Sequence, residues 1–445
     1  MDRKEIILEL IGERKYAVLS HMLKDLEPAD IALLLQDLVK EDLIIAYRLL
    51  PKELAAEAFV YMDNDAQQHL IEAFSDSELT EVLAELFLDD TVDIIEEMPA
   101  SVVKRILRNI APQMRTAVNQ LLNYPKDSAG SIMTIEYVNL KKDMTVRQSF
   151  DRIRRTGVDK ETIYTCYVTD ENRRLIGLVT VKTMLLSDMD SMISDIMETN
   201  IISISTREDK EEVSLLFDKY DFLTLPVVDQ ENRLVGIITI DDAMDVMQDE
   251  NTEDISKMGA VVPLGESYFK TPVVKHAKNR IVWLLFLMLS ATISGIILTT
   301  YEEAFVTFPL LISFIPMLMD TGGNCGAQSS TMIIRGIALG EITFKDFFKV
   351  VFKELRISLL VGVIIAAVNA VRVILMYRDP KLAIVTGITL MFVALLAKLL
   401  GGMLPLLAKK CKLDPAIMAA PLITTIVDAC AVFAYFNIAI WVLGI

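Results

Sequence analysis

Residues 167–180, YVTDENRRLIGLVT, and residues 226–239, PVVDQENRLVGIIT, are two copies of one pattern. The copies align without a gap at an offset of 59 positions. The pairs of identical residues include Asp170/Asp229, Arg174/Arg233, Gly177/Gly236 and Thr180/Thr239. In each copy, an apolar run, a polar turn that begins at the Asp and a β-branched run that ends in Thr indicate two strands followed by a helix. The repeat therefore predicts a pair of small α/β domains.

The repeated unit resembles a tandem pair of cystathionine-β-synthase (CBS) domains. A short element precedes each copy, since Ile132-Met133-Thr134 has its counterpart in Ile196-Met197-Glu198. We expect residues 128–249 to form the pair. The resemblance implies ATP or another adenosine nucleotide as a ligand of these domains.

Residues 1–127 have a helical pattern, with apolar residues three and four positions apart, as in Ile31, Leu34, Leu35 and Leu38. The pattern is interrupted at Glu27-Pro28 and at similar steps further on, where Pro, Ser or Asp suits the first turn of a new helix. A succession of short helices predicts an α-solenoid for this region.

Residues 279–445 contain long apolar runs, and a membrane-spanning helix needs about 20 apolar residues. Five segments satisfy this requirement: 281–300, 305–334, 357–377, 382–407 and 417–443. The sequence therefore predicts an all-α polytopic domain of five helices in a lipid bilayer, joined to the CBS pair by a connector over residues 250–278.

Basic residues indicate how these helices are oriented. They gather at 275–280, 345–356 and 409–412, which by the positive-inside rule are cytosolic. The first residues, MDRKEIILELIGERK, have no uninterrupted apolar core of a secretory signal, so the N-terminus is expected in the cytosol. Five spans then place the C-terminus outside a plasma (inner) membrane, although Arg378 and Lys381 fall in a loop expected outside.

Charge is divided at the same boundary as hydropathy. Residues 271–445 contain 15 Lys and Arg against 9 Asp and Glu, so the first 270 residues carry −23 of a chain whose net charge is −17. Such an acidic surface repels nucleic acid and attracts cations. Nucleic acid is therefore not expected as a partner.

Few residues suggest enzymatic chemistry. His21, His69 and His276 are isolated, and the four cysteines have no metal-binding spacing. We find no nucleophile motif or phosphate-binding loop, so the sequence predicts a protein that is not an enzyme.

Asp428 stands in the middle of the fifth predicted span, which contains no Lys or Arg. A charge at the centre of a bilayer costs about 2.5–3.5 kcal/mol unless it faces water or a partner. Pro421, Thr424 or Thr425, and Asp428 fall on one helical face, and the resulting stripe of hydroxyl and carboxylate groups suits an ion path. The alternative is an Asp428 carboxylate that pairs with Arg372 or Lys398 of another span, or that is protonated.

The second predicted span has a polar stripe of its own. Asn324, Gln328, Thr331 and Arg335 recur at helical spacing, and small residues between them permit close approach of another helix. A packing seam explains the glycines but not the two amides, which suit a water-lined path. Asn324 and Gln328 are therefore candidate pore residues.

The chain resembles the MgtE family of magnesium channels over nearly its whole length. The most specific matches are TGGNCGAQSS at residues 321–330, LDPA at 413–416 and TTIVD at 424–428. The resemblance implies a homodimer, binding of the permeating ion at Asp428, and closure of the pore by cytosolic Mg²⁺. Oxygen ligands without a His or Cys cluster agree with Mg²⁺ as the ion.

Acidic residues of the cytosolic part are candidate ligands of regulatory Mg²⁺. Without cations these carboxylates repel one another, and bridging divalent ions would draw the domains together and the connector against the pore. A solvated acidic surface is the simpler alternative. The candidates are Asp90, Asp93, Asp209, Glu211, Asp221, Asp242, Asp245, Glu250, Glu253, Asp254 and Asp414.

The sequence therefore predicts a Mg²⁺ channel or transporter gated by cytosolic Mg²⁺. Two other functions stay open. One is a proton- or ion-coupled secondary transporter of Mg²⁺ or Co²⁺, and the other is a CBS nucleotide sensor that the helices only anchor in the membrane.

Overall fold

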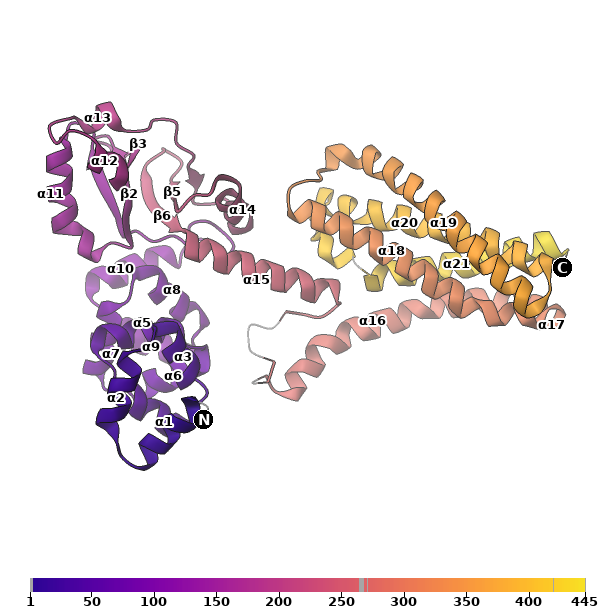
Figure 1. The fold of residues 1–445 in the computed structure, drawn as a ribbon, viewed down its shortest axis with the longest axis horizontal. Coiled ribbons are helices and arrows are strands. Elements are labelled where there is room, and N and C mark those ends of the chain that lie inside the picture. Colours follow the sequence, from indigo (N-terminus) through magenta and orange to yellow (C-terminus); the bar gives the residue numbers. More distant parts are fainter. Residues whose placement is uncertain (1–2, 264–267, 270, 419, 445) are drawn as a thin grey trace. The chain divides into compact units, whose positions relative to one another are not determined.

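A computed structural model describes residues 3–263, 268–269, 271–418 and 420–444. These residues fall into two compact units, Met1–Met247 and Gln248–Ile445 (Figure 1). Part of the predicted connector, residues 264–267 and 270, lies outside the described residues.

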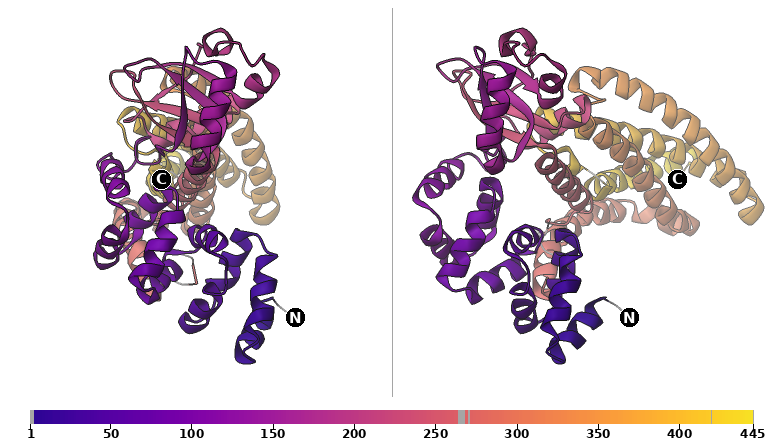
Figure 2. Two further views of the ribbon diagram at one scale, coloured as in Figure 1. Left: turned by 90° about the vertical axis from the view of Figure 1, so that its left-hand side faces the viewer. Right: turned by 60° about the vertical axis from the view of Figure 1, so that its left-hand side comes forward.

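The first unit begins with ten short helices, which follow one another from the N-terminus towards the sheets (Figures 1 and 2). Ser75 caps α7 through a reciprocal pair of hydrogen bonds with Glu78, and Pro28 is the first residue of α3. The predicted succession of short helices is thus confirmed. The helices are α1 (Arg3–Gly12), α2 (Tyr16–Lys24), α3 (Pro28–Leu35), α4 (Lys40–Tyr47), α5 (Lys52–Val60), α6 (Asn64–Ala73), α7 (Asp76–Glu85), α8 (Leu88–Glu97), α9 (Ala100–Asn109) and α10 (Pro112–Leu121).

Two three-stranded sheets follow, in the orders β1-β2-β3 and β4-β5-β6. In each sheet the first pair of strands is parallel and the second is antiparallel. The elements are β1 (Tyr137–Lys141), α11 (Val146–Thr156), η1 (Gly157–Asp159), β2 (Thr162–Thr169), β3 (Leu175–Thr180), α12 (Val181–Leu186), α13 (Ile193–Ile196), β4 (Ile204–Ser205), α14 (Lys210–Tyr220), β5 (Thr224–Val228), β6 (Leu234–Thr239) and α15 (Ile240–Met258).

The two repeated turns have the same hydrogen bonds. Asp170 Oδ1 accepts from the backbone N–H groups of Asn172 and Arg174, each at 2.8 Å. Asp229 Oδ1 accepts from Glu231 at 2.9 Å and from Arg233 at 2.8 Å. The sequence repeat is therefore a repeat of structure.

The second unit consists of helices of the apolar region. It contains α16 (Val273–Thr300), α17 (Glu302–Thr307), η2 (Pro309–Phe314), α18 (Ile315–Ala338), η3 (Phe344–Asp346), α19 (Phe347–Tyr377), α20 (Pro380–Lys410), η4 (Pro415–Met418) and α21 (Ala420–Leu443). In the described part of this unit, α16, α18, α19, α20 and α21 are the five long helices. α20 packs against α18, α19 and α21.

The predicted second span, 305–334, is wrong in its bounds. The chain breaks at Phe308-Pro309, passes through η2 and begins a straight helix only at Ile315, with Pro316 in its first turn. Among the described residues, four segments are long and apolar enough to cross a membrane, and α18 is not one of them: Val273–Thr300, Phe344–Tyr377, Pro380–Lys410 and Pro415–Leu443. The polar residues of α18 lower its hydropathy.

Candidate functional site

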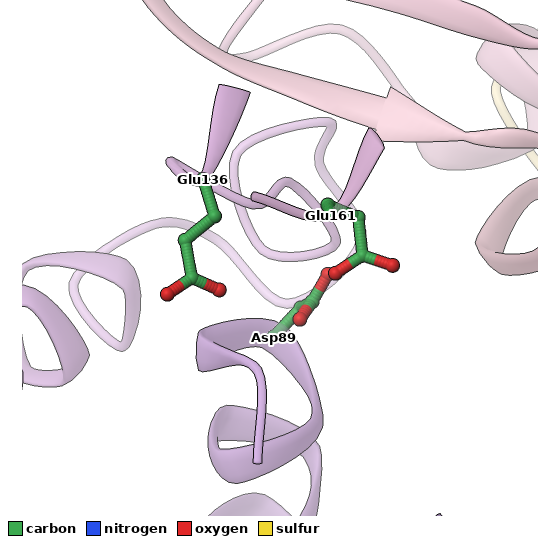
Figure 3. A group of neighbouring side chains, drawn as sticks. All are labelled: Asp89, Glu136 and Glu161. Atoms are coloured by element: carbon green, nitrogen blue, oxygen red, sulfur yellow. The ribbon is translucent and has the colours of Figure 1, made fainter. Parts of the chain in front are cut away.

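Three carboxylates of the first unit converge on one place (Figure 3). Asp89 is in the first turn of α8, Glu136 directly precedes β1, and Glu161 directly precedes β2. Each side chain offers one oxygen, and these three oxygens lie within 4.8 Å of one another. We call these residues the Asp89 group.

The fold explains this convergence. Strands β1 and β2 are parallel, and Tyr137 lies opposite Thr162, so the residues that precede the strands are neighbours. The backbone N–H of Glu161 donates to the carbonyl of Glu136 at 2.9 Å. The N–H of Leu88, at the start of α8, donates to Glu136 Oε2 at 3.1 Å. The positive end of the helix dipole thus faces the Asp89 group and stabilises negative charge there.

Like charges and burial raise the pKa values of these acids. Burial, followed by the charges of Glu161 and Asp90, raises the pKa of Asp89 well above its usual range. Burial and then the charge of Asp242 raise the pKa of Glu161 to about 8. Asp242, in the first turn of α15, has a pKa raised by burial and by Asp89, although its Oδ2 accepts a 2.6 Å hydrogen bond from Thr239. Asp242 is therefore a fourth member of this electrostatic cluster.

Two further predicted residues belong to the same cluster. Burial and the charge of Asp241 raise the pKa of Asp90 to about 6. Burial and the charge of Asp90 raise the pKa of Asp93 to about 7, and Asp245 contributes to this shift. The structure therefore brings together four of the predicted regulatory residues: Asp90, Asp93, Asp242 and Asp245.

The Asp89 group fits a hard divalent cation. Its ligand atoms are all carboxylate oxygens, the type that Mg²⁺ and Ca²⁺ prefer. Glu161 Oε2 is buried and has no hydrogen-bond partner among the described residues. A cation at this position would supply the missing partner and remove the mutual repulsion.

Glu136 and Glu161 were not among the residues predicted from sequence. The available signal was their position: each directly precedes a strand of the first CBS unit, and the residues before two parallel strands lie at the same edge of a sheet. The repeat pattern does not specify that β1 pairs with β2. Without this pairing, the positions of the two glutamates in the sequence could not be recognised as a shared site.

These pKa values give a pH dependence that Mg²⁺ should remove. A folded pKa raised above its ordinary value means that the protonated form stabilises the fold, and that this stability is lost as pH rises through the folded pKa. In EDTA, the melting temperature of the detergent-solubilised chain should therefore fall between about pH 6 and pH 8. Saturating Mg²⁺ should raise the melting temperature more at pH 8 than at pH 6.

Glu161→Gln tests the assignment of this effect. The variant should have a flatter pH dependence in EDTA, while the exposed-residue control Glu171→Gln should match the parent. A melting temperature in EDTA that does not change with pH would contradict the account of these carboxylates.

Three predicted residues have positions at the ends of α14 and are not members of the Asp89 group. Asp209 caps the N-terminus of α14 and accepts from the N–H of Glu211 at 2.9 Å. Asp221 ends the helix in a left-handed conformation, with φ of 54°. All three side chains are exposed.

A second acidic group lies in the second unit and contains a lysine. Lys257 Nζ, near the end of α15, lies 2.5 Å from Asp414 Oδ2 and also pairs with Glu253. Asp414 Oδ1 accepts from the N–H of Ala416 at 2.7 Å and so caps η4, directly before α21. Burial and the charge of Asp414 raise the pKa of Asp254. Three predicted residues, Glu253, Asp254 and Asp414, are thus brought together, whereas Glu250 lies one helical turn earlier on α15.

The predicted pore residues lie where α18 and α21 cross. A Cβ atom at Gly322 would lie 2.7 Å from Val427, at Gly323 2.7 Å from Thr424, and at Gly326 2.4 Å from Ile423. Residues further along α18 contact residues nearer the start of α21, so the two helices are antiparallel. Only glycine permits this approach.

Asp428 follows Val427 at this crossing and is half-buried. The Thr424 and Thr425 hydroxyls donate to the carbonyl of Pro421 at 2.9 and 3.0 Å. Since their protons are used within the helix, these hydroxyls offer lone pairs to a cation. Asp428 forms no ion pair with a Lys or Arg of the described residues.

Neither basic residue of the alternative is paired with Asp428. Arg372 donates to Asn369 Oδ1 at 2.8 Å and contacts the Met317 sulfur at 2.9 Å. Lys398 is buried in α20 and acts electrostatically on Cys325. The charge that does act on Asp428 is another carboxylate, Asp320 of α18.

Asn324 and Gln328 are exposed on one face of α18. With Ala327, Thr331 and Met332, they line an open groove of about 700 Å³. Asp320, one turn before Asn324, is exposed on the same face but is not one of the candidate pore residues. Its spacing of four from Asn324 places it on that face.

The chain is similar to known proteins in each of its three regions. A family described as a divalent cation transporter matches residues 315–438, the MgtE intracellular N domain matches residues 26–127, and the CBS domain matches residues 129–189 and 193–249. The magnesium transporter MgtE of Thermus thermophilus is 35% identical over 97% of this chain and 96% of its own length. The magnesium transporter MgtE of Bacillus subtilis is 29% identical over the same shares of the two chains.

Solved structures match the cytosolic part. The crystal structure of the cytosolic domain of the Mg²⁺ channel MgtE in complex with ATP is 36% identical, with a TM-score of 0.52, and covers 54% of this chain and 98% of that one. The soluble part of a magnesium transporter is 27% identical, also with a TM-score of 0.52, over 56% of this chain and 98% of that one.

Proposed function

The chain belongs to the MgtE family of magnesium transporters, and we propose that it conducts Mg²⁺ into the cytosol along a path that contains Asp428. The observation that carries the proposal is an intramembrane carboxylate without a basic partner among the described residues, at a glycine-mediated crossing with an amide-bearing helix. Thr424, Thr425, Asn324 and Gln328 add oxygen groups that hold a hydrated ion. This arrangement suits Mg²⁺, which releases its water reluctantly.

The path lies between two copies of the chain. Asn324 and Gln328 are exposed on α18, and a polar face directed at lipid is unfavourable. A second copy that covers this face would enclose the groove and bring two Asp428 carboxylates to one ion. The chain is thus a homodimer in the plasma (inner) membrane, with a cytosolic N-terminus and the C-terminus outside.

Cytosolic Mg²⁺ closes the path. Ions at the Asp89 group would join α8 to the first CBS domain, next to Asp242 at the start of α15. Near the other end of α15, Lys257 pairs with Asp414, in the segment before α21. The proposed regulatory residues remain Asp90, Asp93, Asp209, Glu211, Asp221, Asp242, Asp245, Glu250, Glu253, Asp254 and Asp414. The CBS pair binds ATP or another adenosine nucleotide, as supported by the ATP complex of the related cytosolic domain.

The proposed division of the chain follows these roles. Residues 1–127 and 128–249 sense the ion, residues 250–278 transmit the signal, and residues 279–445 form the path. The proposed function is transport, and no enzymatic reaction is assigned to the chain.

Flux into proteoliposomes separates this function from its alternatives. A channel carries Mg²⁺ along its own gradient without a dependence on a proton gradient, whereas a coupled transporter requires the proton or another ion. The coupled transporter remains a candidate because the Asp320 carboxylate acts electrostatically on Asp428, and such a pair of acids could carry a proton. A membrane-anchored sensor would bind adenosine nucleotide and pass no Mg²⁺.

Asn324→Ala should reduce Mg²⁺ flux or alter the preference between Mg²⁺ and Co²⁺, with a smaller effect than a change at Asp428. A neutral amide orients ion-bound water but contributes no net charge. Parallel flux assays of the two ions measure this. Asn437→Ala, also an exposed Asn of a membrane helix, is the control, and parental flux and selectivity in Asn324→Ala would remove this residue from the path.

A further inference from the structure

A buried carboxylate on α19 lies behind the polar face of α18. Glu354 is 7% exposed, and its Oε2 accepts a hydrogen bond of 2.6 Å from the Ser329 hydroxyl, which is 3% exposed. No ion pair of Glu354 occurs in the part of the chain that the structure describes. Burying a carboxylate without a hydrogen-bond partner costs free energy, so the hydrogen bond from Ser329 is strongly favoured over an unpaired Glu354.

Three helices enclose this hydrogen bond. On α20, a Cβ atom at Gly402 would lie 3.0 Å from Glu354 Cγ, and one at Gly401 would lie 3.1 Å from Ser329 Cβ. Because both positions are glycine, α20 approaches both partners closely. The pair therefore has little room to separate without moving a helix.

The neighbouring serine fixes α18 on another side. The Ser330 hydroxyl donates to the carbonyl of Met418 at 2.8 Å, in the segment directly before α21. Two consecutive residues thus hold α18 to two different elements, while Gln328 and Thr331 on either side of them are exposed on the groove. Successive residues point about 100° apart around a helix. The buried serines and the exposed Gln328 and Thr331 therefore keep these positions together in only one rotation of α18.

We propose that Glu354 is a positioning residue of the ion path: by accepting the Ser329 hydrogen bond it fixes the rotation of α18, and so keeps Asn324 and Gln328 on the groove. This inference rests on the proposed Mg²⁺ path but concerns a residue outside it. The carboxylate acts as a hydrogen-bond acceptor and does not bind the permeating ion.

The test compares Mg²⁺ and Co²⁺ flux in proteoliposomes that contain the full-length chain. Glu354→Ala and Ser329→Ala should each change the Mg²⁺:Co²⁺ flux ratio by about threefold or more. In the double variant, the flux ratio should change no more than in the more affected single variant, because both substitutions remove the same hydrogen bond. Glu354→Gln should keep the parental ratio, since its amide oxygen still accepts from Ser329.

Ser358→Ala is the matched control. Ser358 is also buried on α19, one turn away, but its hydroxyl donates to Leu355 of its own helix at 2.8 Å. Parental selectivity in Ser358→Ala supports the proposal. A shift equal to that of Ser329→Ala would show a general effect of perturbing α19 and overturn it.

Two further results would overturn the proposed role of Glu354. Parental selectivity in Ser329→Ala, or a shift in Glu354→Gln as large as in Glu354→Ala, overturns the proposal; the second result would assign the role to charge. If Glu354→Ala does not fold, Ser329→Ala and Glu354→Gln give the answer alone. A parent that passes no Mg²⁺ would instead contradict the proposed function.

Discussion

Asp428→Asn should nearly abolish Mg²⁺ flux while the folded protein stays abundant. The amide preserves the size of the side chain but removes the negative charge of α21 at its crossing with α18. A unit charge about 4 Å from a divalent ion contributes several kcal/mol even at an effective dielectric constant near 20. If only about 2 kcal/mol of this acts on the permeating ion, flux falls roughly thirtyfold.

The measurement is initial Mg²⁺ uptake into proteoliposomes at matched protein content. Asp379→Asn is the control, because it removes the same charge from the start of α20, where Asp379 accepts from the N–H of Lys381 at 2.9 Å. Size-exclusion profiles and melting temperatures should be alike in all three proteins. Parental flux in Asp428→Asn would show that Asp428 does not lie on the path.

A triple variant of the cytosolic cluster should conduct Mg²⁺ but resist inhibition by it. Asp89→Asn, Glu161→Gln and Asp242→Asn together remove the carboxylates whose pKa values are raised by burial and by one another. To change a gate from about 1:99 to 99:1 requires ~5.5 kcal/mol of preference for one state. Removing one site that contributes about 1.4 kcal/mol should raise the inhibitory Mg²⁺ concentration roughly tenfold.

Patch-clamp recording with Mg²⁺ stepped on the cytosolic face measures this shift. The matched control neutralises three exposed acids of the CBS region, Asp143, Glu171 and Asp218. In EDTA, the triple variant of the cluster should be at least as stable as the parent at pH 8, because it lacks the repulsion. Closure at the parental concentration would show that the cluster does not control the gate.

The sequence predicted most of the architecture because its signals are local. The repeat with an offset of 59 specified two copies of one unit, and the short helices were marked by residues such as Pro28 and Ser75 at their starts. Four of the long helices followed from their apolar length, whereas α18 is too polar to satisfy that criterion. The break at Phe308-Pro309 was missed because composition alone does not distinguish an apolar loop from an apolar helix.

The candidate sites were predicted only in part, because they depend on contacts between distant residues. Asp428, Asn324 and Gln328 could be selected because a polar residue in an apolar span is unusual in itself. Glu136 and Glu161 are ordinary surface acids in the sequence and gain significance only when β1 and β2 pair. The role of Lys257 beside Asp414 likewise requires the folded chain.

Recording the purified chain in a planar bilayer, with a Mg²⁺ gradient and equal pH on both sides, tests whether it is a Mg²⁺ channel. We expect a Mg²⁺ current that reverses at the Mg²⁺ equilibrium potential, is unaffected by an imposed proton gradient, and is closed by Mg²⁺ added to the cytosolic face. Absence of Mg²⁺ current, or a reversal potential that follows the proton gradient, would contradict it.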